Sequence, residues 1–227
     1  MSATGPRRPG GIPAMAELVF DCIGARADRY AIVPSFSLAL RISETTGQQV
    51  DAIALRAQLR IEPFRREYSE AEADRLHDLF GERQRWSDTL KPLQFAMIST
   101  MVPGFTGSIE VDLPVPFSYD LQIASTRYFG SLDEGDIPLL LLFSGTIFGQ
   151  ADGRLRVQQV PWSKETTYRL PVSLWREAVD AHFPDAAWIT MSRQTLDDLI
   201  RFKTRHALPT WDATVAALLA QAGQEES

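Results

Sequence analysis

Residues 53–61 read Ile-Ala-Leu-Arg-Ala-Gln-Leu-Arg-Ile, with an apolar side chain at every odd-numbered position. An alternation with a period of two is typical of a β-strand that buries one face and exposes the other to water. Residues 35–42 alternate in the same way. A turn signal, Thr-Thr-Gly-Gln at residues 45–48, lies between the two segments. We therefore expect them to form an antiparallel pair with one face in water.

Four more segments carry strand signatures. Residues 95–102 predict one strand, and residues 155–160 predict the return strand of a hairpin that starts with residues 137–148. That first hairpin strand is apolar on both faces, which is typical of a strand buried on both sides. Residues 109–117 alternate but include two prolines, which donate no hydrogen bond to a ladder. We therefore expect this strand at a sheet edge or at a bulge.

Helix signals occur once among the strands and then dominate the C-terminal part. Ser69 and Glu72 form a capping-box pattern that opens a helix, which Gly81 ends. Three further helices are predicted after Pro171. The residues expected to cap them are Ser173, Thr195 and Thr210. Strands followed by helices predict an α+β fold: antiparallel, β-sandwich-like sheets with one inserted helix and C-terminal helices packed on them.

The chain has 227 residues, a length that usually forms one large domain or two small ones. Residues 1–14 predict a disordered tail, and Met15 is a second candidate for the first residue. No linker rich in Gly and Ser separates the strands from the helices. We therefore expect a single domain over residues 15–227, strand-rich over 15–170 and helical over 171–222.

The composition argues against several classes of function. The formal net charge of −6 disfavours nucleic-acid binding, which needs a basic footprint. The longest dense apolar run, residues 137–148, is shorter than the ~20 residues of a transmembrane helix, so no membrane insertion is expected. The single cysteine, Cys22, fits a reducing compartment. A soluble, cytoplasmic protein is the expectation.

Candidate ligands for a transition metal are few and scattered. A lone cysteine excludes every zinc or iron–sulfur motif built on cysteine pairs, and the apolar neighbours of Cys22 predict a small core residue. The three histidines, His77, His182 and His206, have no second histidine or cysteine at ligand spacing. The sequence therefore predicts no bound cofactor and no metal site of this kind.

Asp133, Glu134 and Asp136 place three carboxylates within four residues. Calcium or magnesium binds such oxygens, but it also needs ligands from elsewhere in the chain, and the spacing does not match an EF-hand loop. A solvated acidic turn is the favoured interpretation. The alternative hypothesis is a metal-assisted hydrolase that uses these three carboxylates.

Four residues are candidates for contact with a partner protein. Arg56 and Arg60 share the wet face of the strand at 53–61. They could bind an acidic partner or a phosphate, or they could be solvated or paired with nearby glutamates. Trp162 and Trp211 lie near element ends, and tryptophan is enriched at interfaces as well as at the rim of a core. No nucleophile lies beside a base in the sequence, so the catalytic residues, if any, are unknown.

A family resemblance rests on four stretches: residues 55–63 (LRAQLRIEP), 99–107 (STMVPGFTG), 137–146 (IPLLLLFSGT) and 207–212 (ALPTWD). Together they resemble an uncharacterised bacterial family that is often encoded beside actinobacterial-type nickel–iron hydrogenase genes. The resemblance implies a role in hydrogenase assembly, maturation or regulation, with a hydrogenase subunit or maturation factor as the partner. It carries over no catalytic residue.

The leading hypothesis is therefore a non-enzymatic accessory protein that binds a protein partner. Besides the hydrolase, a second alternative is a chaperone-like module that holds extended client segments. The predicted edge strand at residues 109–117 motivates this alternative, because an open edge can add a strand from another chain.

Overall fold

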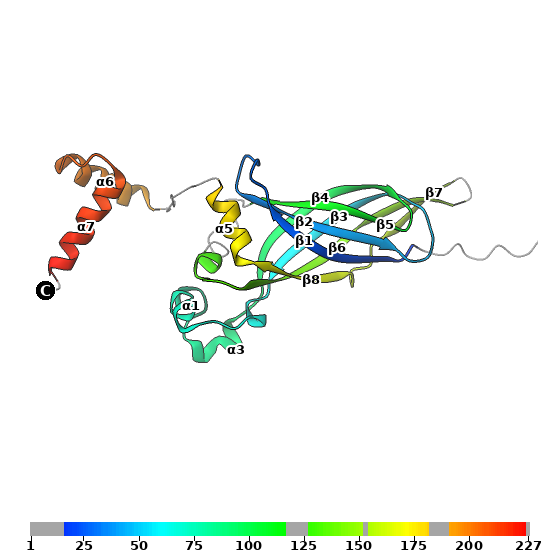
Figure 1. Cartoon of the computed structure of the whole chain (residues 1–227), viewed down its shortest axis with the longest axis horizontal. Helices are drawn as coiled ribbons and strands as arrows, with labels where there is room; N and C mark the ends of the chain where they lie inside the picture. The colour runs from blue at the N-terminus through cyan, green and yellow to red at the C-terminus, as the bar shows by residue number, and fades with distance from the viewer. Residues whose placement is uncertain (1–15, 117–126, 152–153, 182–190, 226–227) are drawn as a thin grey trace, which may run out of the picture. The chain divides into compact units, whose positions relative to one another are not determined.

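The structure, a computed structural model, describes residues 16–116, 127–151, 154–181 and 191–225 (Figure 1). The predicted tail and His182 lie outside these residues. The chain divides into two compact units, Met1–Pro184 and Asp185–Ser227, and each is described by itself below. No helix among the described residues has both the length and the apolar character needed to cross a lipid bilayer.

The first unit is built on two antiparallel sheets. The three-stranded sheet has the order β1-β2-β5 and contains β1 (Leu18–Ala27), β2 (Ser35–Glu44) and β5 (Ser108–Pro116). The five-stranded sheet has the order β4-β3-β6-β7, with β8 also paired to β6. Its strands are β3 (Val50–Ile61), β4 (Leu93–Phe105), β6 (Asp136–Ala151), β7 (Arg154–Gln159) and β8 (Glu165–Pro171).

The core lies between the two sheets. On β2, the apolar positions Phe36, Leu38, Leu40 and Ile42 are all fully buried. The apolar side of β3, from Ile53 to Ile61, is buried as well. An aromatic contact joins the two layers: the rings of Phe20 on β1 and Phe143 on β6 stack with their centroids 4.3 Å apart. The alternation in the sequence thus identified the buried faces of both strands correctly.

The predicted pairing of these two strands is wrong. β2 pairs with β1 and β5, whereas β3 pairs with β4 and β6, so the two strands lie in opposite sheets. The carboxylate of Glu44 organises the connection between them, because it accepts hydrogen bonds from the backbone N–H groups of Thr46 at 3.1 Å and Gln48 at 2.8 Å. A period of two reports which face of a strand is buried, and both strands meet the same core from opposite sides.

β6 is the long central strand of the five-stranded sheet. One of its edges pairs with β3, and the other pairs first with β8 and then with β7. The change of partner occurs at Gly145, whose φ is +146°. A Cβ atom there would lie 2.1 Å from the carbonyl oxygen of Ala54, so this position requires glycine. The prediction that this strand is buried on both faces is correct for its inner face only, since Leu140 and Leu142 are half-exposed.

β5 is the edge of the three-stranded sheet, as its prolines predict. The inserted helical region also begins as predicted, because the capping box of Ser69 and Glu72 is present. The single expected helix is instead two short helices, α1 (Glu70–Arg75) and α2 (His77–Phe80), which end at Gly81 with φ +70°. Three more turns surround them: η1 (Pro63–Arg65), η2 (Arg83–Arg85) and α3 (Trp86–Thr89).

Three helices follow the sheets, so the α+β class is confirmed. α5 (Val172–Asp180) packs on β1, β2 and β8, and its N-cap is Pro171 rather than the predicted Ser173. α6 (Arg193–Arg205) and α7 (Trp211–Glu225) pack on each other in the second unit. α6 is capped by Ser192 rather than Thr195, whereas the Thr210 hydroxyl caps α7 as predicted and accepts the N–H of Ala213 at 3.1 Å.

Candidate binding face on the five-stranded sheet

The five-stranded sheet has an outer face that points away from the core. β3 contributes its even-numbered residues to this face, and the strand register fixes their neighbours. Arg56 lies between Ser99 of β4 and Ser144 of β6. The outer face includes Met97, Ser99 and Met101 of β4, Ala54, Arg56, Gln58 and Arg60 of β3, Leu140, Leu142, Ser144 and Thr146 of β6, Leu155 and Val157 of β7, and Glu165, Thr167 and Arg169 of β8.

Large apolar side chains on this outer face are open to water. Met97 is 50% exposed and Met101 is 64% exposed, and both lie on the edge strand β4. On the opposite edge, Leu155 of β7 is 72% exposed and Val157 is 53% exposed. Figure 1 shows α1, α3 and α5 gathered toward one end of the two sheets. Exposed apolar patches of this kind mark interaction sites more often than chance would give.

Arg56 is central on the outer face, and its side chain is exposed, with no side-chain hydrogen bond or ion pair to any residue that the structure describes. Arg60, on the same face, is engaged: its Nη2 donates to the Oε1 of Gln58 at 3.2 Å. The Gln58 amide in turn donates to Gln94 at 3.4 Å. The structure thus brings the two predicted arginines onto one face, where the Arg60 side chain is bound to Gln58 and the Arg56 side chain has no described partner.

Two more arginines, Arg65 and Arg66, follow Arg56 and Arg60 in the sequence, and both are paired. Arg65 contacts the buried Glu62, with 2.8 Å between Nε and Oε2. Arg66 and Glu72 form a buried ion pair, with 2.6 Å between Nη2 and Oε1 and side chains only 9% and 5% exposed. The glutamates near these arginines, Glu62 and Glu72, are thus paired with Arg65 and Arg66, whereas Arg56 forms no ion pair with a described residue.

Glu72 has two roles, of which the sequence indicated only the cap. Its Oε2 accepts the N–H of Ser69 at 3.1 Å, and its Oε1 accepts the N–H of Asp133 at 2.9 Å. Burial disfavours the charged form of this carboxyl, but the two N–H groups and the Arg66 guanidinium outweigh burial and hold the pKa of Glu72 below its ordinary value of 4.5. Glu72 therefore ties α1 to the acidic loop as an ionised group.

The acidic loop is bound by arginines. Arg66 donates to the carbonyl oxygens of Asp136 at 2.9 Å and Glu134 at 2.6 Å. Arg75 forms an ion pair with Asp133, with 2.6 Å between Nη2 and Oδ2. Among the described residues, no three His, Cys, Asp or Glu side chains gather closely enough to hold a metal ion. The described contacts of this loop thus include the guanidinium groups of Arg66 and Arg75 as well as the carboxylate of Glu72.

The two candidate tryptophans belong to different compact units of the chain. Trp162 follows β7 in the connection to β8 and is 90% exposed. Trp211 is the first residue of α7 in the second unit and is 46% exposed, with the Lys203 ammonium 5.9 Å from its ring centroid.

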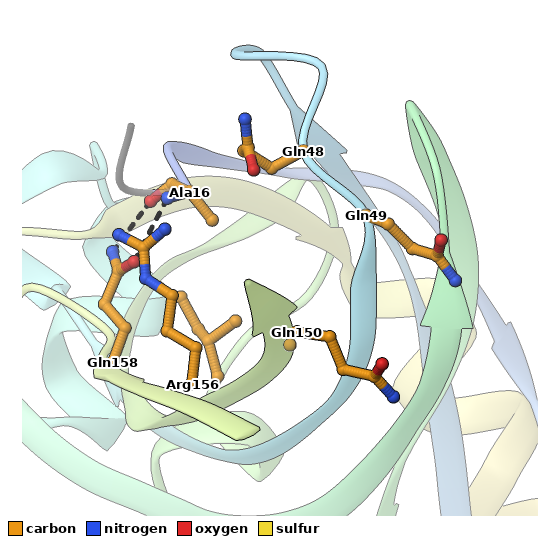
Figure 2. Close-up of a pocket in the computed structure, with 8 residues that line it drawn as sticks. Ala16, Gln48, Gln49, Gln150, Arg156 and Gln158 are labelled. Atoms are coloured by element: carbon orange, nitrogen blue, oxygen red, sulfur yellow. Dashed lines mark hydrogen bonds between the residues drawn. The ribbon is translucent and has the colours of Figure 1, made fainter. Parts of the chain in front are cut away.

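A small depression lies beside β6 and β7, lined chiefly by glutamines (Figure 2). Its cavity volume is about 20 Å³, which is room for about one water molecule. The Gln158 side chain closes one side by pairing with the backbone of Ala16, accepting its N–H at 3.0 Å and donating to its carbonyl at 2.8 Å. The Gln158–Ala16 contact ties residue 16 to β7. The depression itself is too small for an organic substrate.

Cys22 is half-buried, and burial raises the pKa of its thiol to about 11. A thiol of this kind stays protonated near neutral pH and is a poor nucleophile. His77 lies 3.3 Å from Glu82 at an exposed site, and the His206 ring packs on Phe202 with centroids 4.3 Å apart. None of these groups lies on the outer face.

Fold and site together define an α+β protein on a two-sheet antiparallel sandwich, with an open face that carries an unpaired arginine among apolar side chains. The chain belongs to the family described as "Family of unknown function (DUF6084)", which matches residues 15–227. The resemblance to an uncharacterised family is confirmed to that extent. No curated protein matches the sequence.

The chain is also similar to parts of two solved structures of β-glucosidase 3B from Thermotoga neapolitana. The complex with α-D-glucose has 11% identity over 68% of this chain and 17% of that one, with a TM-score of 0.25. The glycerol complex has 10% identity over the same shares, with a TM-score of 0.23. Since this chain spans only 17% of those chains and the TM-scores are low, the similarity carries no argument about function.

Proposed function

We propose that this protein is a non-enzymatic accessory protein that binds a protein partner through the outer face of the five-stranded sheet. One observation carries the proposal: Arg56 stands without a described partner at the centre of this face, between two pairs of large apolar side chains that are 50% to 72% exposed. Arginine and methionine are both enriched at protein interfaces, and arginine is common among the residues that dominate binding energy.

The chemistry of this face specifies what the partner must present. Binding would remove the Arg56 guanidinium from water, and a buried charge is costly unless it is paired. The two neighbouring serines, Ser99 and Ser144, add short polar groups but no charge. The partner therefore presents a carboxylate to Arg56 and apolar side chains to the methionines of β4 and to Leu155 and Val157 of β7.

The partner class we propose is a hydrogenase subunit or a hydrogenase maturation factor. The four sequence stretches that resemble the hydrogenase-associated family support this part of the proposal, and three of them, residues 55–63, 99–107 and 137–146, supply strands of the outer face. The face and the resemblance therefore involve the same strands.

The chaperone-like alternative has weaker support. β5 ends the three-stranded sheet, but Pro114 and Pro116 have no N–H to offer an incoming strand. Its acidic side chains are also engaged, since Asp112 and Glu110 each form an ion pair at 2.7 Å, with Arg26 and Arg41. An edge with missing donors is a poor template for an extended client.

The test measures binding of the purified chain to purified hydrogenase subunits and maturation factors by biolayer interferometry. Arg56→Glu reverses the charge at the centre of the face and is expected to weaken binding at least tenfold, or about 1.4 kcal/mol. Arg85→Glu is the matched control, because Arg85 is an exposed arginine on η2, away from the five-stranded sheet. Equal affinities of the two variants would contradict the proposal that the partner binds this face. If the chain binds none of these components, and a strain that lacks the chain has normal hydrogenase activity, the proposed partner class is wrong.

A further inference from the structure

The second unit is a well-defined helical hairpin. α6 ends at His206, and Ala207 turns the chain with φ +49°. The Lys203 ammonium then donates to the carbonyl oxygens of Leu208 at 2.8 Å and Pro209 at 3.1 Å, immediately before α7 begins. These local contacts fix the connection between the two helices.

This hairpin does not bury its apolar side chains by itself. Among its described residues only Thr214 is buried. Apolar side chains of both helices remain exposed: Leu196 (38%), Ile200 (44%), Trp211 (46%), Val215 (45%) and Leu219 (68%). Two helices bury only the side chains at the single interface between them. A stable helical domain needs a core that further helices or a sheet enclose.

α7 exposes a surface that is unusual for a helix in water. Residues 213–224 contain no charged side chain, over a length of about 18 Å. Trp211, Val215 and Leu219 follow one another at intervals of four and form one exposed apolar stripe. A helix that is apolar on most sides is normally buried against another surface. An uncharged stripe is compatible with an identical stripe, because no like charges would meet.

The charges of α6 are distributed unevenly along its length. The first half carries Arg193, Asp197 and Asp198, a net charge of −1, and the second half carries Arg201, Lys203 and Arg205, a net charge of +3. Arg201 also forms an ion pair with Asp198 of the same helix. When two copies of such a helix are related by a two-fold axis and run antiparallel, the acidic half of each faces the basic half of the other. The helix is therefore complementary in charge to a second copy of itself.

We propose that residues 191–225 are a dimerisation unit whose partner is the same hairpin of a second copy of this chain. The exposed stripes of α7 and of α6 pack against their counterparts across a two-fold axis and make a four-helix bundle. The bundle encloses Val215 and Leu219, which one hairpin leaves in water. This inference is independent of the proposed function, because it uses neither the outer face nor the hydrogenase partner.

Sedimentation equilibrium of the full chain tests the dimer over about 1 to 100 µM, a range that brackets weak to moderate affinities. The wild-type protein is expected to approach twice the 25.4 kDa of one chain as its concentration rises. The double variant Val215→Glu/Leu219→Glu is expected to weaken dimerisation at least tenfold, because each stripe would then carry like charges and face another that does the same. Both positions are exposed, so the substitutions leave the hairpin fold intact.

Leu155→Glu is the matched control, since Leu155 is 72% exposed and Leu219 is 68% exposed, and both are leucines. This control is expected to dimerise like the wild type. A wild-type protein that stays at the mass of one chain at every concentration would overturn the inference. A dimer that survives the double substitution, or that Leu155→Glu dissociates, would equally overturn it, because the interface would then lie elsewhere.

Discussion

Removal of the Arg66 guanidinium is expected to destabilise the first unit strongly. Arg66→Met deletes the 2.6 Å contact with Glu72 and the hydrogen bonds to the carbonyl oxygens of Glu134 and Asp136. Methionine keeps much of the side-chain length, so the change isolates the charge and its donors. Glu72, with a side chain only 5% exposed, would remain as a buried carboxylate without its cation.

The expected loss follows from that burial. Removing one partner of a buried ion pair costs about 3 to 5 kcal/mol. Domains are stable by about 5 to 15 kcal/mol, so the variant would lose a large share of the free energy of unfolding. At about 2 to 4 °C per kcal/mol for a chain of this size, the unfolding midpoint would fall by roughly 6 to 20 °C.

The assay is urea unfolding followed by tryptophan fluorescence, since Trp86 is buried close to this region and its ring contacts that of Tyr68. Arg26→Met is the control: Arg26 also forms a 2.7 Å ion pair, with Asp112, but both side chains are more than half exposed. An exposed pair contributes only about 0 to 1 kcal/mol. If Arg66→Met costs no more than Arg26→Met, the reasoning from burial is refuted.

Three further predictions concern single groups. The fold holds the pKa of Glu72 below the ordinary value, so the stability from its ionised form is complete above about pH 5 and is lost as pH falls through the folded pKa; acid titration of Glu72→Gln should show a shallower loss, and an identical profile would contradict this. Gly145→Ala should unfold at least about 3 kcal/mol more easily or fail to fold, because its Cβ meets the Ala54 carbonyl oxygen at 2.1 Å; near-wild-type stability by calorimetry would show that the strand can shift. Cys22, with a pKa of about 11 against an ordinary 9.0, should be alkylated about a hundredfold more slowly at pH 8 in the folded protein than in urea; equal rates would show that the thiol is exposed.

Part of the outer face could be predicted from the sequence. The alternation at residues 53–61 placed Arg56 and Arg60 on the wet side of one strand, and the structure agrees. The apolar side chains that flank Arg56 could not be predicted, because Met101 and Leu155 come from other strands. Their proximity depends on which strands pair and in what register, and neither is encoded in a local pattern.

The sequence by itself determined the features whose cause is local. Alternation identified the buried faces of β2 and β3, the prolines indicated that β5 is an edge strand, and the Ser69–Glu72 pattern began α1, because each rests on neighbouring residues only.

Only the tertiary structure decided the features that depend on distant segments. It separated β2 and β3 into opposite sheets, turned Leu155 outward and gave Glu72 a second role at the acidic loop 61 residues further along. The physical reason is that both sheets bury an apolar face in one shared core. The alternation of apolar residues therefore does not determine which strands pair, because several pairings would bury the same side chains. The choice among them falls to contacts between distant segments, such as the ring contact of Phe20 on β1 with Phe143 on β6.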